Sequence, residues 1–144
     1  MGYSLGGYNT ALLSCLDADL ACAIPGIPLT DFTRAIYQHG PVLQLRTAEQ
    51  AGLEEERVRD AMSVVSPLVL EPQLPWERRY IFGAVADRLV PPDQVRDLWR
   101  HWERPRIEWY QGGHVSFRAH RSVARFIGTA LRESGLAAPA AARR

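Results

Sequence analysis

Three short strand-like segments, separated by helical patterns, limit the possible folds of this chain more than any other feature. The segments are 20–28, 78–87 and 106–114. The first is a nearly continuous apolar run, which is typical of a strand that is buried on both faces of a parallel sheet. The second is predicted to be another buried strand, and the third a strand that runs into a glycine-rich loop. Amphipathic helical patterns occupy 5–16, 29–38, 47–62, 91–103 and 118–134. This alternation predicts an α/β fold with a parallel sheet of about three strands and flanking helices.

Local signals mark the start of two of these helices. Thr47 is followed three residues later by Gln50, a spacing that predicts a capping box at the start of the helix over 47–62. The helix over 91–103 begins with two prolines and Asp93, as helix N-termini often do. The segment 66–75 is interrupted by proline and is predicted to be irregular.

Composition excludes several classes of protein. The chain has 144 residues, enough for one domain, and its 17 basic residues, all arginine, are interleaved with 16 acidic ones. Without a basic stripe, no nucleic-acid partner is predicted. No apolar run approaches the ~18 residues of a transmembrane helix, so no membrane span is predicted. Cys15 and Cys22 are expected to be reduced thiols, and the expected location is cytoplasmic.

Three polar residues follow predicted strands or begin helices where a parallel sheet gathers its reactive groups. Ser4 lies in Gly2-Tyr3-Ser4-Leu5-Gly6, a G-x-S-x-G pattern typical of a sharp turn that exposes a serine at the start of a helix. Asp87 ends the second strand-like segment, and His114 ends the third, after two glycines. Because such groups lie beyond the carboxyl ends of parallel strands, we expect these three side chains to meet.

Other residues of the same types have simpler explanations. Ser4 alone could be a helix N-cap. Asp31 and Asp93 are expected at helix starts, and the remaining histidines, at positions 39, 101 and 120, on the surface or at helix caps. No cluster of cysteine and histidine has the spacing of a zinc site, and the absence of lysine excludes a P-loop. No metal and no cofactor are therefore predicted.

The segments GYSLGG, GAVADRLVPP and YQGGHVS, in this order, resemble the C-terminal half of the α/β-hydrolase superfamily, starting at the nucleophile elbow. The resemblance implies that Ser4 is the nucleophile, His114 the general base, and Asp87 the carboxylate that orients the imidazole. It further implies that the backbone N–H of Leu5 is one donor of the oxyanion hole.

The resemblance also implies how the domain is organised. Residues 1–135 would form the C-terminal portion of a hydrolase domain, with a cap-like insertion at about 29–75, and residues 136–144 a disordered tail. The strand that leads into Ser4, the other N-terminal strands and the second oxyanion donor would be missing. The apolar strand around Leu20–Ile24 would then have an exposed edge, which permits self-association.

The predicted function is a serine hydrolase that acts on a small-molecule ester or thioester through an acyl-enzyme, as esterases and lipases do. Tyr3 and Trp76 are expected to line the substrate pocket. Because the chain would be truncated, we expect weak activity or none from it alone. The alternative is a non-catalytic hydrolase remnant that acts as a binding or interaction domain.

Overall fold

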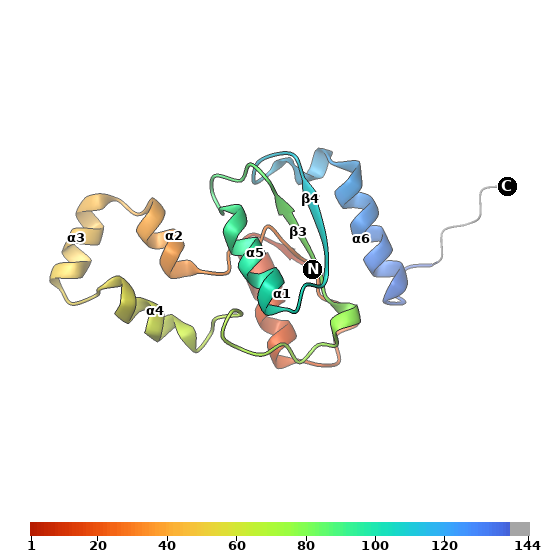
Figure 1. Cartoon of the computed structure of the whole chain (residues 1–144), viewed down its shortest axis with the longest axis horizontal. Coiled ribbons are helices and arrows are strands. Elements are labelled where there is room, and N and C mark those ends of the chain that lie inside the picture. Colours follow the sequence, from red (N-terminus) through yellow and green to blue (C-terminus); the bar gives the residue numbers. More distant parts are fainter. Residues whose placement is uncertain (139–144) are drawn as a thin grey trace.

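A four-stranded parallel sheet organises the structure, a computed structural model that describes residues 1–138 (Figure 1). Its strands are β1 (Gly2–Tyr3), β2 (Pro25–Gly26), β3 (Tyr80–Ala84) and β4 (Arg106–Tyr110), and they lie side by side in chain order. The predicted α/β class and parallel sheet are confirmed, with four strands where about three were expected. The predicted tail is outside the described residues from position 139 onward.

Helices connect the strands and cover both faces of the sheet. The helices are α1 (Leu5–Leu16), α2 (Phe32–His39), α3 (Val42–Gln50), α4 (Glu55–Ser63), α5 (Pro92–His101) and α6 (Arg121–Glu133), with short 3₁₀ turns η1 (Trp76–Arg78) and η2 (Ser116–Ala119). In Figure 1, α5 and α6 lie on opposite sides of β3 and β4. No helix within residues 1–138 is long and apolar enough to cross a membrane.

The alternation of side chains along β3 divides the core in two. Tyr80 and Phe82 pack in one apolar cluster with residues of β4 and α6, whereas Ile81 packs in the other with residues of α1 and α5. Successive strand residues point to opposite faces, so one strand contributes to both clusters. All five residues of β3 are buried, which explains why this segment is a nearly continuous apolar run.

The start of the sheet differs from the prediction. Gly2 and Tyr3, expected to lack a strand, form β1 and pair in parallel with Pro25 and Gly26. A strand of two residues is too short to show any periodicity in the sequence. Because β2 has β1 on one side and β3 on the other, the segment Leu20–Ile24 is not the exposed edge that was expected. Ile24 is fully buried, and β1 forms the edge of the described sheet.

The helix predicted over 47–62 was also wrong, because the chain turns in its middle. Gly52 has a φ of 81°, a backbone conformation that glycine adopts readily and that ends α3. The amide N–H of Leu53 then donates to the carbonyl of Ala48, which closes the turn before α4 begins. Thr47 lies inside α3, where its hydroxyl donates to the Leu43 carbonyl, so the expected capping box does not form.

Helices α2, α3 and α4 form an insertion between β2 and β3 that projects to one side of the sheet (Figure 1). Asp31 caps α2, as expected for a helix-start residue, because its side chain accepts a hydrogen bond from the backbone N–H of Arg34. The insertion is also attached to α5. The Thr30 hydroxyl donates to the carbonyl of Gln94, and the Asp31 backbone N–H donates to the Gln94 side-chain oxygen.

Replacing Gly26 with alanine should destabilise the fold, because the added Cβ would overlap the aromatic ring of Phe82. Overpacking of this kind typically costs about 1–3 kcal/mol. Gly128→Ala is the matched control: its Cβ would meet only the flexible end of Arg132 inside a helix. It should stabilise the chain by about 0.5–1 kcal/mol. Urea unfolding followed by circular dichroism measures both, and equal stabilities for the two variants would contradict the packing described for β2.

Candidate functional site

Ser4 occupies a strained turn between β1 and α1. Its φ of 53° and ψ of −116° lie in a region that residues other than glycine rarely adopt, at a cost of about 1–3 kcal/mol. Backbone bonds hold the turn on both sides. The Ser4 N–H donates to the carbonyl of Gly26 at 3.0 Å, and the Ser4 carbonyl accepts from Tyr8 at 2.9 Å and Leu29 at 3.3 Å.

Small residues make this turn possible, although not all for the same reason. A Cβ at Gly2 would collide with the carbonyl of Gly6, and a Cβ at Gly7 would lie 2.8 Å from the carbonyl oxygen of Gly26. A Cβ at Gly6 would meet nothing within 4 Å. The turn therefore requires glycine at positions 2 and 7, because other parts of the backbone pass so close to Gly2 and Gly7.

Asp87 and His114 form a hydrogen-bonded pair at the carboxyl edge of the sheet. Asp87 follows β3, and its carboxylate is buried, with a side chain only 1% exposed. One carboxylate oxygen accepts from the backbone N–H groups of Leu89 and Val90, both at 2.9 Å. The other accepts from His114 Nδ1 at 2.7 Å. This bond fixes the proton on Nδ1 and leaves Nε2 of the neutral imidazole as a proton acceptor.

Ser4 lies at the same edge of the sheet but is not bonded to this pair. Parallel strands β1, β3 and β4 end on the same side, so the residues that follow them share one edge. Phe117, in η2 just after His114, packs on Tyr3 with a centroid distance of 4.4 Å. Within residues 1–138, however, no hydrogen bond joins the Ser4 hydroxyl to His114. The structure thus brings Asp87 and His114 together and docks the histidine loop beside the residue that precedes Ser4.

The loop that carries His114 is held by two hydroxyl groups. Tyr110, at the end of β4, and Ser116 both donate to the carbonyl of Gly113, at 3.1 and 3.0 Å. The backbone N–H of Ala86 donates to the carbonyl of Gly112, which joins this loop to the segment before Asp87. Burial, together with the nearby negative charge of Asp87, raises the pKa of Tyr110 to about 12. Sequence reasoning assigned a role only to the histidine of the segment YQGGHVS and missed these two hydroxyls, which lie in the same segment.

The backbone N–H of Leu5 is the first of α1. The first N–H groups of a helix have no acceptor in the preceding turn. No hydrogen bond takes up the Leu5 N–H anywhere in the described part of the chain. It is available to an anion at the positive end of the helix dipole.

The two expected pocket residues lie in different places. Tyr3 is half-buried and packs on Phe82 and Phe117 next to the Ser4 turn. Trp76 lies in η1, which precedes β3 and is therefore at the amino end of the sheet, opposite to His114. Its indole N–H donates to the carbonyl of Glu103 at 3.1 Å. The structure does not bring Trp76 to the candidate site.

The other histidines and the aspartate that were considered as alternatives to His114 and Asp87 have other partners or positions in the fold. His39 bonds the carbonyl of Leu89, and His101 bonds that of Leu70, while His120 is the N-cap residue of α6. Asp93 lies in the first turn of α5, as expected. Across residues 1–138, no group of three or more histidine, cysteine, aspartate or glutamate side chains is placed to hold a metal ion.

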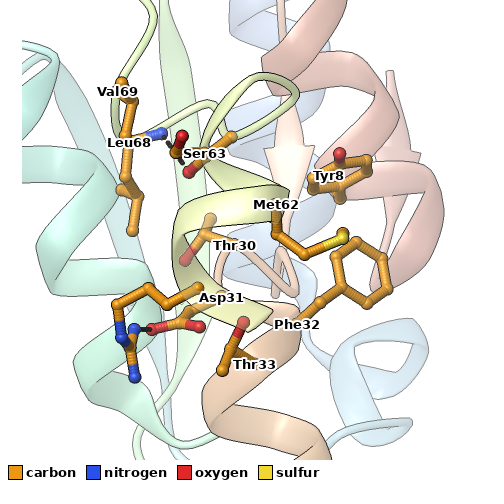
Figure 2. Close-up of a pocket in the computed structure, with 11 residues that line it drawn as sticks. Tyr8, Thr30, Asp31, Phe32, Thr33, Met62, Ser63, Leu68 and Val69 are labelled. Carbon is orange, nitrogen blue, oxygen red and sulfur yellow. Dashed lines mark hydrogen bonds and ion pairs between the residues drawn. The ribbon is translucent and has the colours of Figure 1, made fainter. Parts of the chain in front are cut away.

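A cavity of about 150 Å³ lies beside α1 and was not expected from the sequence (Figure 2). Its walls come from α1, the start of α2, the end of α4 and the loop that follows α4; they include Tyr8, Phe32, Met62 and Leu68. Only the folded insertion brings these four segments together. No local pattern in the sequence could therefore have indicated the cavity.

Comparison with known proteins places this geometry in context. No family model matches the chain. Two uncharacterized proteins of Mycobacterium tuberculosis, MT2702 and Rv2627c, are each 41% identical to it over 136 residues. The match covers 94% of this chain but only 32% of each relative, so the chain spans about a third of their length.

The fold of this chain is shown by its similarity to solved structures. An acetyl xylan esterase from Paenibacillus sp. R4 superimposes with a TM-score of 0.64 at 20% identity, over 90% of this chain and 44% of the esterase. A butyrate-bound esterase from Thermogutta terrifontis matches with a TM-score of 0.61 at 23% identity, over 96% of this chain and 56% of that one. An acylaminoacyl peptidase from Pyrococcus horikoshii matches with a TM-score of 0.62 at 18% identity, over 87% and 21%.

The chain therefore has an α/β-hydrolase fold, of which it contains a part. The turn at Ser4, the buried carboxylate and the histidine follow the first, third and fourth strands of the sheet in this partial fold.

The raised pKa of Tyr110 predicts how stability changes in alkaline solution. Tyrosine ionises near pH 10 in the unfolded chain but only near pH 12 in the folded one. From pH 10 to 12 the unfolded state loses this proton first, so the free energy of unfolding falls by about 1.4 kcal/mol per pH unit. Tyr110→Phe should remove this contribution and leave that of Tyr80, whose pKa is also about 12. Urea unfolding at pH 9 and pH 11.5 measures the free energy of unfolding of the wild type and of Tyr110→Phe. An identical fall in this free energy between the two pH values in both proteins would contradict the prediction.

Proposed function

We propose that this chain contributes the reacting groups of a serine hydrolase that cleaves carboxylic esters or thioesters through an acyl-enzyme. The observation that carries the proposal is the Asp87–His114 hydrogen bond, which lies at the same sheet edge as the strained Ser4 turn. Fold alone does not define a reaction, whereas a buried carboxylate bonded to a half-buried imidazole beside an accessible serine suits acyl transfer.

In this mechanism His114 Nε2 accepts the proton of the Ser4 hydroxyl as the serine oxygen attacks the substrate carbonyl carbon. Asp87 remains ionised and stabilises the imidazolium that forms. The negative charge on the carbonyl oxygen is stabilised by the N–H of Leu5 at the start of α1. His114 then returns the proton to the leaving alcohol or thiol. Water repeats the sequence on the acyl-enzyme, releasing the acid and restoring Ser4.

The missing Ser4–His114 hydrogen bond is compatible with this role. In structures without substrate, such bonds are often long or poorly aligned and tighten when substrate binds. The contact between Phe117 and Tyr3 already holds the histidine loop next to the serine turn. In our proposal, a small adjustment of the loop over 111–116 brings the Ser4 hydroxyl and His114 within hydrogen-bonding distance of each other.

We further propose that the chain alone is a weak catalyst. The oxyanion hole needs a second donor besides the N–H of Leu5, and in this fold it comes from a segment that precedes the serine strand. Removing one such donor costs about 10²–10³ in rate. The chain matches 44% of the acetyl xylan esterase and 32% of the mycobacterial relatives, which supports a function that depends on more of the fold than these residues.

The insertion suggests how the substrate pocket is shaped, and the edge strand β1 suggests how the sheet is extended. Residues 29–75, which contain α2 to α4, would act as a cap that shapes the substrate pocket. The edge strand β1 offers unpaired backbone groups, which favour pairing with another strand of the fold or of a second copy. Cys15 and Cys22 are free thiols, which supports a reducing compartment such as the cytoplasm.

The second candidate is a non-catalytic domain that binds a ligand or partner with the same fold. The observation that favours it is that the Ser4 hydroxyl makes no hydrogen bond to His114 within the described residues. A domain of this kind would keep the cavity beside α1 without needing a competent serine. Covalent labelling separates the two candidates.

A fluorophosphonate probe should label Ser4, because it reports an activated serine without requiring a known substrate. Ser4→Ala should abolish labelling, and His114→Ala should slow it by about 10²–10⁴, the usual contribution of a general base. His101→Gln is the matched control, since His101 bonds the carbonyl of Leu70 and lies in α5. Mass spectrometry of the labelled peptide gives the rate. Labelling of His114→Ala at the wild-type rate would refute the assignment.

The labelling rate of Ser4 should differ between this chain alone and a longer protein that contains it. Joining to this chain the part of the mycobacterial relative that lies outside the matched third should raise the labelling rate of Ser4 by about 10²–10³, the value of one oxyanion donor. The same fusion with Ser4→Ala is the control. No labelling in either form, with the fold intact by circular dichroism, would favour the non-catalytic domain.

A further inference from the structure

The cavity beside α1 is adjacent to the backbone of the serine turn. The Ser4 carbonyl accepts hydrogen bonds from the N–H groups of Tyr8 and Leu29. Tyr8 is itself part of the cavity wall, and Leu29 directly precedes the wall residue Thr30. Tyr8 lies four residues beyond Ser4, which is about 6 Å along a helix axis. The wall of the cavity therefore includes a residue that lies roughly one helical turn from the proposed nucleophile.

Three of the five hydroxyl groups in the wall already donate hydrogen bonds within the protein. The Tyr8 hydroxyl donates to the carbonyl of Val65 at 2.7 Å, and the Thr30 hydroxyl to that of Gln94 at 3.1 Å. The Ser63 hydroxyl donates to the carbonyl of Asp60. A polar ligand would have to break these bonds, whereas an apolar ligand leaves them intact.

The one carboxylate in the wall is neutralised by its neighbours. Asp31 has a side chain only 10% exposed, and one of its oxygens accepts from Arg59 at 2.7 Å. The other oxygen accepts from the backbone N–H of Arg34 at 2.8 Å. In Figure 2 Asp31 lies away from Tyr8, while Met62 and Phe32 lie beside Tyr8. The wall therefore does not demand a charged ligand.

The size of the cavity limits what can enter. Its volume is about 150 Å³. An apolar protein cavity of about this volume holds one benzene molecule, a group of about six carbon atoms. Pockets for drug-sized ligands measure about 300–1,000 Å³. The cavity accordingly suits a short aliphatic or aryl group better than a long lipid chain.

We propose that this cavity receives the apolar substituent of the ester, an aliphatic or aryl group of up to about six carbons. The assignment rests on the proposed function, because it places this group one turn from Ser4. Phe32, Met62 and Leu68 form the apolar surface that contacts it. The group belongs to either the acyl or the alcohol side of the substrate, and the experiment has an arm for each.

The first measurement is of binding and does not require activity. 1-Hexanol is titrated into the Ser4→Ala chain and followed by saturation-transfer NMR, with 1-dodecanol for comparison. Hexanol should bind and dodecanol should not. Met62→Trp, which fills the cavity, should weaken hexanol binding about tenfold or more. The matched control is Leu43→Trp on α3, where Leu43 is 77% exposed and outside the cavity wall.

A second variant guards against misfolding of the first. Phe32→Ala enlarges the cavity and should admit 1-decanol, which the unaltered chain excludes. Equal hexanol affinity in Met62→Trp and Leu43→Trp, with both folded by circular dichroism, would overturn the proposal. Absence of hexanol binding to the Ser4→Ala chain would overturn it as well, and would leave the proposed reaction of Ser4 intact.

The second measurement is of hydrolysis by the wild-type chain. One arm varies the acyl group in 4-nitrophenyl acetate, butyrate, hexanoate and decanoate; the other varies the alcohol in a series of alkyl acetates. One series should show kcat/KM highest at four to six carbons, and Met62→Trp should move the optimum to shorter groups. Equal kcat/KM across both series would overturn the assignment. No hydrolysis in either arm by the chain or by its fusion with the rest of the mycobacterial relative, with hexanol binding intact, would overturn the proposed function instead.

Discussion

Parallel pairing of the four strands is the constraint on which the site depends. Because β1, β3 and β4 run in the same direction, the residues after them emerge at one edge, however far apart they are in the chain. Ser4, Asp87 and His114 are separated by helices and by the whole insertion, yet they share this edge. Reversing any one strand would carry its residue to the opposite edge of the sheet, where η1 and Trp76 lie.

Within that edge, the protein combines a strained backbone with a buried charge. The turn at Ser4 keeps its unfavourable φ because backbone bonds from β2 and α1 hold it on both sides. Asp87 remains buried because two backbone N–H groups and His114 satisfy its carboxylate. The strained turn and the buried carboxylate would each be energetically unfavourable alone. Neighbouring groups that the parallel sheet positions stabilise both of them. This local support explains how the turn and the buried carboxylate keep their conformations in the part of the fold that the chain contains.

Much of the fold could be predicted from the sequence, because buried strands and amphipathic helices leave periodic patterns. β3, β4, α5 and α6 follow such patterns closely. β1 could not be predicted, since two residues carry no period, and α3 and α4 were merged because the left-handed turn at Gly52 resembles ordinary helix sequence. The Asp87–His114 contact agrees with the motif order. The cavity depends on long-range packing of Tyr8 against α4 and its following loop, which no local pattern encodes.

The attachment of the insertion at Gln94 has a consequence for how such a protein can diversify. Thr30 and Asp31 bond the backbone carbonyl and side-chain oxygen of this one residue, at the start of α5. Beyond this anchor, α3 has no buried residue and its sequence is free of packing demands from the sheet. A lineage could therefore exchange the outer helices to admit different molecules while its reaction chemistry stayed the same, so that selectivity and reactivity evolve as separable traits.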